Sequence, residues 1–184
     1  MSDETPADRY ARLRERFGAT LAAVPDDGWQ RPTPCEDWTV HELVQHVVDT
    51  QGQFESMVGR AIPPGPTGDL PAAAYDHATG VVLADLRDPD VAATPYDSPI
   101  FGPTTFEAMV DGFLSFDFIV HGWDLAHAIG VDDTIPDADV AWVRRRTDEL
   151  GDLMRTSGQI GAEVEVGPDA SPTERLVAFL GRRP

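Results

Sequence analysis

The feature that most constrains the fold is the stretch from Asp117 to Gly130, which has helical spacing and carries three ionisable side chains on one expected face. At about 100° per residue, Asp117 and His121 lie roughly 40° apart, and Asp124 lies between about 20° and 60° from each of them. Apolar residues continue this face toward the N-terminus: Phe106, Val110 and Phe113. A carboxylate and an imidazole rarely face the core of a small protein without a partner, and a divalent metal ion is one such partner.

Composition limits the class of protein. The chain has 184 residues, 41% hydrophobic and 25% charged, which predicts a globular domain over residues 1–184 with a substantial core. Asp, Gly or His interrupts every apolar run before it reaches the length of a membrane span. The acidic start, Met1–Glu4, shows no secretory signal, and the single Cys35 cannot form an internal disulfide. We therefore expect a cytoplasmic protein without a membrane partner.

The charge is strongly negative. The net charge is −18, and all 14 cations are Arg, so an acidic surface argues against nucleic acid or anionic lipid as a partner. A GC-rich genome or adaptation to salt explains the same bias, which therefore says little about chemistry.

Two helices are expected in the first third of the chain. The first begins at Pro6, capped by Thr5, and its stripe is Tyr10, Leu13, Phe17 and Leu21. The second follows a capping box, Thr39 to Glu42, and its stripe is Leu43, Val47 and Phe54. His46 lies within this second stripe.

Further helices are expected beyond residue 70. The third spans about 70–86, with one side formed by Leu70, Ala74, His77, Val81 and Ala84. Residues 88–103 are rich in Pro and predict irregular structure with a short extended piece. The fourth helix spans 105–128 and stops at Gly130. Next come a fifth helix over 137–158, a short strand over 162–166, and a last helix after the Ser171–Glu174 capping box. The predicted fold is therefore all-α: a four-helix bundle with C-terminal additions.

His46, Asp117 and His121 are the strongest candidates for a site. Asp117 and His121 are four residues apart, so both can reach one ion from one helix face, and His46 would approach from a facing helix. Two imidazoles and one carboxylate suit zinc, nickel or iron(II), with coordination positions left open. The alternative is that His121 pairs with Asp117 and His46 is a core histidine. Asp124 is the alternative acidic ligand, or it orients a ligating imidazole from behind.

Other candidates have weaker patterns. Cys35 precedes a helix N-terminus, where a thiolate is favoured, so it is a candidate nucleophile; the alternative is a small apolar loop residue. His77 and His127 are expected to be packed or half-exposed helical residues. Residues 144–146, three consecutive Arg, are expected to form a solvated face. We find no Walker loop, nucleophile elbow or dinucleotide-binding glycine motif.

Three segments together resemble the mycothiol-dependent maleylpyruvate isomerase N-terminal domain family, within the DinB/YfiT-like metalloenzymes. The first runs from Trp29 through Pro32-Thr33-Pro34-Cys35 and Trp38-Thr39-Val40 to His46. The second is Val120-His121-Gly122-Trp123-Asp124-Leu125-Ala126, and the third is the end of the chain from Ser171-Pro172 to Gly181-Arg182-Arg183-Pro184. The likeness covers nearly the whole chain, and the motifs are specific in combination.

The resemblance implies a DinB-type four-helix bundle that holds a divalent metal at one end of a groove. The family's ligands are a His on the second helix, then an acid and a His four residues apart on the fourth, which match His46, Asp117 and His121. The acid is Asp here rather than Glu, and its shorter side chain alters the reach to the metal.

The resemblance also implies a reaction class: isomerisation or S-transfer with a low-molecular-weight thiol such as mycothiol. A metal lowers the pKa of a bound thiol, and the thiolate then attacks a small electrophile. We expect zinc first, with nickel or iron as alternatives, a small thiol and an electrophile as partners, and a homodimer. The short tail resembles members with no assigned chemistry, so the competing reading is a non-catalytic metal-binding or ligand-sensing bundle.

Overall fold

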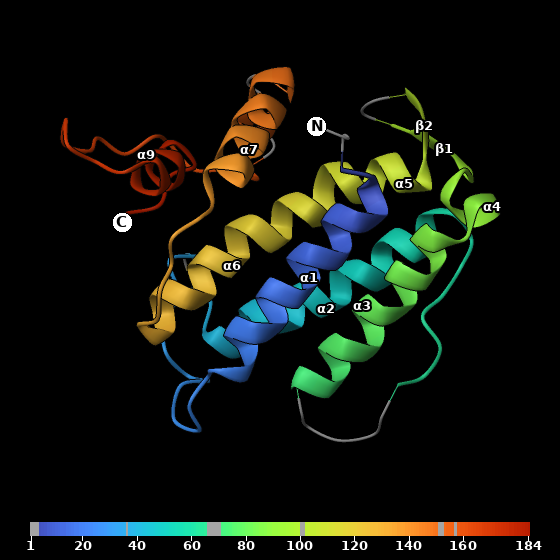
Figure 1. Ribbon diagram of the computed structural model, residues 1–184, viewed down its shortest axis with the longest axis horizontal. Coiled ribbons are helices and arrows are strands. Elements are labelled where there is room, and N and C mark those ends of the chain that lie inside the picture. Colours follow the sequence, from blue (N-terminus) through green and yellow to red (C-terminus); the bar gives the residue numbers. More distant parts are fainter. Residues whose placement is uncertain (1–3, 36, 66–70, 100–101, 151–152, 157) are drawn as a thin grey trace.

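The long helices of the bundle lie side by side in a computed structural model (Figure 1). The structure describes residues 4–35, 37–65, 71–99, 102–150, 153–156 and 158–184. Four long helices form the bundle: α1 (Pro6–Ala22), α2 (Val40–Met57), α3 (Pro71–Arg87) and α6 (Ser115–Ile129). Helix α1 contacts α3 and α6, and α2 contacts the same two helices, so the four close into a ring. The predicted all-α, DinB-like bundle is confirmed.

The first two helices begin where their capping residues predict. The Thr5 hydroxyl accepts a hydrogen bond from the backbone N–H of Asp8, and the reciprocal capping box of Thr39 and Glu42 is complete. The stripe predicted for α1 is buried, and Tyr10 at its start donates a 2.6 Å hydrogen bond to Gln51 of α2. Capping and apolar spacing therefore suffice to place these two helices.

The buried face of α3 differs from the prediction. Its buried residues include Tyr75, Ala78, Val82 and Leu86, a stripe shifted from the predicted side that contained His77. The shift follows from Tyr75, whose ring stacks on Phe17 at 5.2 Å and whose hydroxyl donates to a backbone oxygen of α1. Leu70, the predicted first member of the stripe, lies outside the described residues.

The Pro-rich segment after α3 contains the expected extended piece. A short helix α4 (Pro89–Ala92) leads into two antiparallel strands, β1 (Pro95–Ser98) and β2 (Gly102–Thr105), with Pro95 opposite Thr105. The hairpin lies at the far end of the bundle from α9 (Pro172–Phe179) (Figure 1). The strand predicted over 162–166 is wrong: this segment has no regular secondary structure and runs along α9, where the N–H of Val164 donates to the backbone oxygen of Ala178.

The fourth predicted helix is interrupted. It consists of α5 (Phe106–Met109), a π-helical turn η1 (Val110–Leu114) and α6. A π turn adds a residue to the repeat and rotates the following helix relative to the preceding one. Phe106 and Val110 are consequently buried in the core, while Phe113 is only half-buried, so the single stripe predicted from Phe106 to His121 is wrong at this point.

The C-terminal part packs beyond α6 (Figure 1). The predicted fifth helix is found as α7 (Asp137–Leu150) and α8 (Leu153–Thr156), and α9 is the predicted last helix. Helix α6 ends at Gly130, as predicted, in the left-handed conformation. Gly181 has a φ of +92°, and a Cβ built there would lie 2.6 Å from the Cα of Gly161. These two glycines allow the end of the chain to pack closely against the segment after α8.

The core is continuous from the bundle into the C-terminal part, because buried Leu176, Val177 and Leu180 belong to the same cluster as Phe118 of α6.

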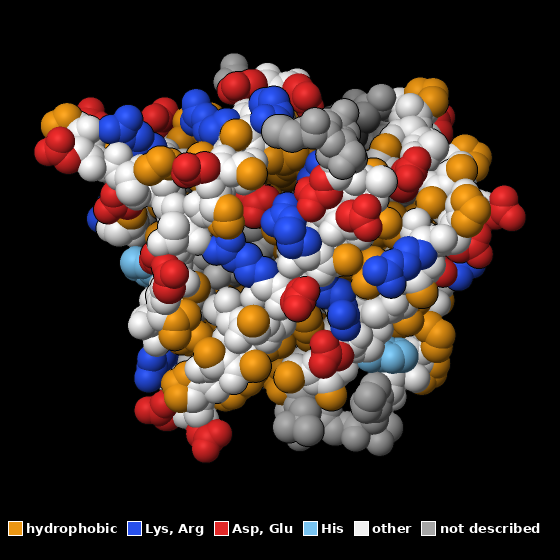
Figure 2. All heavy atoms as spheres, in the orientation of Figure 1, with side chains coloured by type: hydrophobic (Ala, Val, Ile, Leu, Met, Phe, Trp, Pro, Cys, Tyr) orange, Lys and Arg blue, Asp and Glu red, His pale blue; other side chains and the backbone are white. Residues whose placement is uncertain are grey.

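Arg and acidic side chains lie next to one another over the face that carries α1 (Figure 2). Arg12, for example, pairs with Asp139 at 2.9 Å. Within the described ranges, no helix is long and apolar enough to cross a membrane.

Candidate functional site

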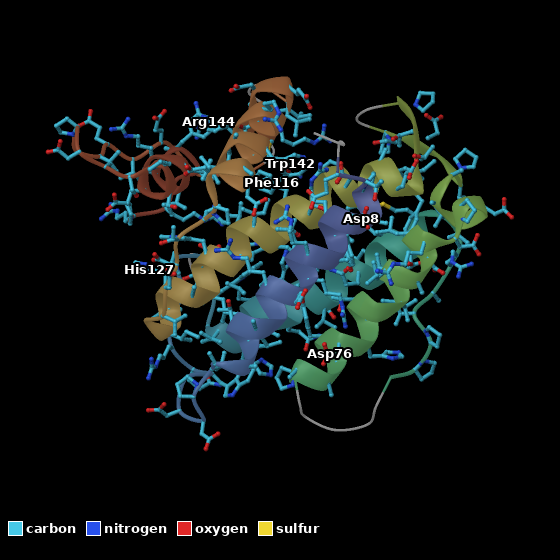
Figure 3. All side chains as sticks on the ribbon, viewed as in Figure 1. Asp8, Asp76, Phe116, His127, Trp142 and Arg144 are labelled. Carbon is cyan, nitrogen blue, oxygen red and sulfur yellow. The ribbon has the colours of Figure 1, made fainter. Side chains whose placement is uncertain are left out.

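A groove of about 600 Å³ lies between α2, α6 and the C-terminal part. Its apolar wall comes from the bundle and from α7 and α8: Trp38, Phe54, Phe113, Phe116, Leu150 and Met154. Phe116, which Figure 3 labels, comes from α6, and Leu150 is the last residue of α7. The polar lining of the groove includes Cys35, His46, Asp117, His121 and Arg182.

The π turn shapes one side of this groove. Gly112 and Phe113 of η1 both line it, and the Phe113 ring packs 6.0 Å from that of Phe54 on α2. Extra turns of this kind are frequent at functional sites because they redirect side chains without ending the helix. Here the turn comes just before Asp117.

The structure brings the three predicted residues together. His46 Nε2 lies 3.6 Å from Asp117 Oδ2, and the His46 and His121 rings are 5.2 Å apart. One ligand atom from each of His46, Asp117 and His121 falls within 4.8 Å of the other two. His121 is the most buried of the three, with 11% of its side chain exposed against 32% for His46 and 27% for Asp117. These three residues, called the metal triad below because they could hold a metal ion, line the groove, and His46 and Asp117 are the more exposed of them.

Asp124 occupies a different position. It is completely buried, and its Oδ2 lies 3.0 Å from Nδ1 of His121. His121 therefore uses Nδ1 toward Asp124 and leaves Nε2 as its free ring nitrogen. A carboxylate behind an imidazole fixes the orientation of the ring and increases its basicity. The pairing of His121 with Asp117, the simple alternative from the sequence, is replaced by His46 with Asp117 and His121 with Asp124.

The charges around His121 are strongly coupled. Burial by itself lowers the pKa of His121, but the hydrogen bonds to Asp124 and Cys35 and the charge of Asp117 raise it to about 10. Burial by itself raises the pKa of Asp124, but His121 and Arg182 bring it down to about 2. Asp124 is therefore ionised, held between two cationic partners in the metal-free protein.

Arg182 is the residue that sequence reasoning missed. Its Nε and a terminal nitrogen donate to the two oxygens of Asp124 at 3.0 and 2.9 Å, and only 10% of its side chain is exposed. The contact joins residues 58 positions apart, so no local pattern predicts it. The only signal in the sequence was the resemblance of the final motif, Gly181 to Pro184, to the family.

The loop before α2 supplies two further neighbours. The Trp38 ring lies 4.7 Å from the His46 ring and 5.9 Å from the His121 ring. Cys35 Sγ lies 3.2 Å from Asp124 Oδ2 and 3.7 Å from His121 Nδ1. Thr33 holds the loop: it donates hydrogen bonds to the backbone oxygens of Cys35 and Trp38, and its hydroxyl accepts one from the N–H of Cys35. Cys35 is half-buried in the groove, so it is part of the site's surroundings and not an isolated loop residue.

The weaker candidates have structural partners. His127 stacks on Trp123 at 4.7 Å and pairs with Asp133 at 2.9 Å. His77 lies 2.8 Å from the backbone oxygen of Pro63. The Arg run is not a purely solvated face, because the Arg144 guanidinium lies 3.9 Å above the Phe179 ring.

Comparison with known proteins gives one family and two relatives. The sequence profile of the mycothiol maleylpyruvate isomerase N-terminal domain matches residues 10–126. Two uncharacterized proteins of Mycobacterium tuberculosis, from strains CDC 1551 / Oshkosh and H37Rv, are each 30% identical over 179 residues, covering 96% of this chain and 97% of the relative. No solved structure matches the chain. The profile spans the bundle and ends within α6, two residues after Asp124.

Proposed function

Because the chain belongs to the mycothiol maleylpyruvate isomerase N-terminal domain family, we propose that it binds a divalent metal ion and acts on a low-molecular-weight thiol of the mycothiol type. His46, Asp117 and His121 are the ligands in this proposal. The reaction class is S-transfer to a small electrophile, or isomerisation of one. The observation that carries the proposal is the meeting of these three side chains, from two helices, at a groove of about 600 Å³.

The donor set fits such an ion. Two imidazole nitrogens and one carboxylate oxygen are typical of catalytic zinc sites with an open position, and they also suit nickel and iron(II). At zinc–ligand bond lengths, a nitrogen and an oxygen bound to one tetrahedral ion lie about 3.3 Å apart. His46 Nε2 and Asp117 Oδ2 are 3.6 Å apart, so Asp117 needs only a small adjustment. Its shorter side chain, compared with the Glu of the family, does not prevent the contact.

A divalent ion at this position would lower the pKa of a coordinated thiol and favour the thiolate at neutral pH. Asp124 keeps the His121 ring in one orientation, and Trp38 packs against both imidazoles. The aromatic wall of Phe54, Phe113 and Phe116 offers an apolar surface to the body of an electrophile. The chain therefore supplies metal ligands, their support and a substrate wall from adjacent elements.

Metal content is the first test. Bound zinc, nickel and iron are measured in the wild type, His46→Ala and His121→Ala after growth with each metal, with the exposed His41→Ala as the matched control. We expect about one ion in the wild type and the control, and a large loss in the two triad variants. Equal and near-zero occupancy in all four proteins would reject the site.

Turnover is the second test. Metal-loaded protein is incubated with a series of thiols and small electrophiles, and thiol conjugates or isomerised products are followed by mass spectrometry. Turnover that is lost in His46→Ala supports the enzyme. Retained metal without turnover for any pair would instead support the ligand-sensing bundle, which the same groove can accommodate.

A further inference from the structure

We propose that Cys35, His121 and Asp124 form a second cation site, selective for thiophilic divalent metals, and that the Arg182 guanidinium fills this site when no metal is bound. The thiol triad, as we call these three residues, lies on the opposite edge of the His121 ring from the metal triad, because it uses Nδ1 and leaves Nε2 free. It goes beyond the proposed function, which assigns no metal-binding role to Cys35 or Asp124.

The thiol triad already has the dimensions of a coordination face. Its three edges are 3.7 Å from Sγ to Nδ1, 3.2 Å from Sγ to Oδ2, and 3.0 Å from Nδ1 to Oδ2. Bond lengths to tetrahedral zinc give edges of about 3.6, 3.5 and 3.3 Å for the same three atom pairs. Each edge agrees to about 0.3 Å, so the three atoms are already as close together as ligands of one ion.

Sulfur separates the two sites chemically. The metal triad offers two nitrogens and one oxygen, whereas the thiol triad offers sulfur, nitrogen and oxygen. Thiolate ligands favour soft and borderline cations over hard ones. A soft ion such as cadmium should therefore prefer the thiol triad, whereas zinc should first occupy the metal triad, where no Arg side chain of the described residues competes with it.

Arg182 explains how the thiol triad is balanced without metal. Asp124 carries one negative charge at neutral pH, and the guanidinium that contacts both Asp124 and Cys35 Sγ, at 3.5 Å, neutralises it. When a divalent ion binds, the Cys35 thiol and the protonated His121 ring each lose a proton to solvent, and the thiolate and Asp124 together balance the two positive charges of the ion. The displaced guanidinium moves toward the groove that Arg182 lines, so the exchange leaves no buried charge unpaired.

The exchange also has a route. Cys35, His121 and Arg182 all line the groove, so an ion arriving from solvent meets them directly. Arg182 lies two residues before the last residue of the sequence, and its displacement requires movement of its side chain alone, since its backbone N–H remains bonded to Val177. Arg182 thus acts as a built-in competitor that lowers the affinity of the thiol triad for metal.

The test is a titration with Cd²⁺, followed by the ultraviolet charge-transfer absorption of a sulfur–cadmium bond. The band should appear in the wild type, disappear in Cys35→Ser, and persist in His46→Ala, the matched control that removes a ligand of the metal triad only. Arg182→Gln removes the competitor, and we expect its Cd²⁺ affinity to rise at least about tenfold, equivalent to about 1.4 kcal/mol.

Two results would overturn the proposal: no band in either the wild type or Arg182→Gln, or an equal band in Cys35→Ser. The comparison of wild type with Cys35→Ser decides the matter even if Arg182→Gln fails to fold. Zinc content of Cys35→Ser reports on the metal triad separately. If the wild type shows no cadmium band but Cys35→Ser still binds zinc, the thiol triad is rejected and the proposed function stands. If the wild type shows the band but Cys35→Ser binds no zinc, the metal triad is rejected and the thiol triad stands.

Discussion

Replacing Asp117 and Asp124 by Asn, one at a time, separates a metal ligand from the group that supports it, because the two changes should affect different measurements. Asp124 is fully buried and bonded twice to Arg182, which is itself only 10% exposed. Asp124→Asn leaves that guanidinium buried without its anion, which costs about 3–5 kcal/mol of the free energy of unfolding. For a chain of this length, the midpoint of thermal unfolding should fall by about 6–20 °C.

Asp117→Asn should behave in the opposite way. Its side chain is 27% exposed and its partner His46 is 32% exposed, at 3.6 Å, so the pair contributes at most about 1 kcal/mol to stability. As a metal ligand, however, Asp117 should matter more than a supporting residue, whose loss weakens metal binding about 10–100-fold. We therefore expect near-normal thermal stability with a loss of zinc affinity greater than that of Asp124→Asn.

The assay combines thermal unfolding of the metal-free proteins with zinc titration by calorimetry. The titration is done in the Cys35→Ser background, so that only the metal triad contributes. Asp133→Asn, which changes a carboxylate paired with exposed His127, is the control for a general effect of lost charge. If Asp124→Asn loses zinc completely and Asp117→Asn keeps it, Asp124 is the ligand and the assignment of Asp117 is wrong.

Three further predictions concern the scaffold. Burial of its side chain, and then the negative charge of the neighbouring Asp85, raise the pKa of Glu55 to about 7, so the stability that protonated Glu55 contributes is lost as the pH rises from about 4.5 to 7. Glu55→Gln should remove up to about 3 kcal/mol of this pH dependence in unfolding titrations. A wild-type stability that does not change over this pH range would contradict the prediction. Gly181→Ala places a side chain at a φ of +92° against Gly161 and should cost about 1–3 kcal/mol of unfolding free energy in denaturant titrations, an expectation that an unchanged midpoint would refute. Thr39→Ala removes the cap of α2 and should cost about 1 kcal/mol by the same titrations, while Thr39→Ser should cost little.

The local signals in this chain proved sufficient for most helix positions. Capping residues and apolar spacing placed α1 and α2, and Gly130 placed the end of α6. These features depend on neighbours three or four residues away, which the sequence displays directly. The buried face of α3 could not be predicted from local signals, because Tyr75 is buried through its contacts with Phe17 and the backbone of Arg14 on another helix.

The sequence by itself determined the bundle, and it placed Asp117 and His121 four residues apart on one helix as candidate partners of His46. Only the tertiary structure decided that Asp117 faces His46 while Asp124 lies behind His121. The physical reason is that the angles along one helix give both carboxylates nearly the same direction. Which of them faces the groove depends on the rotation of α6 after the π turn, and on Arg182, which reaches Asp124 from the other end of the sequence.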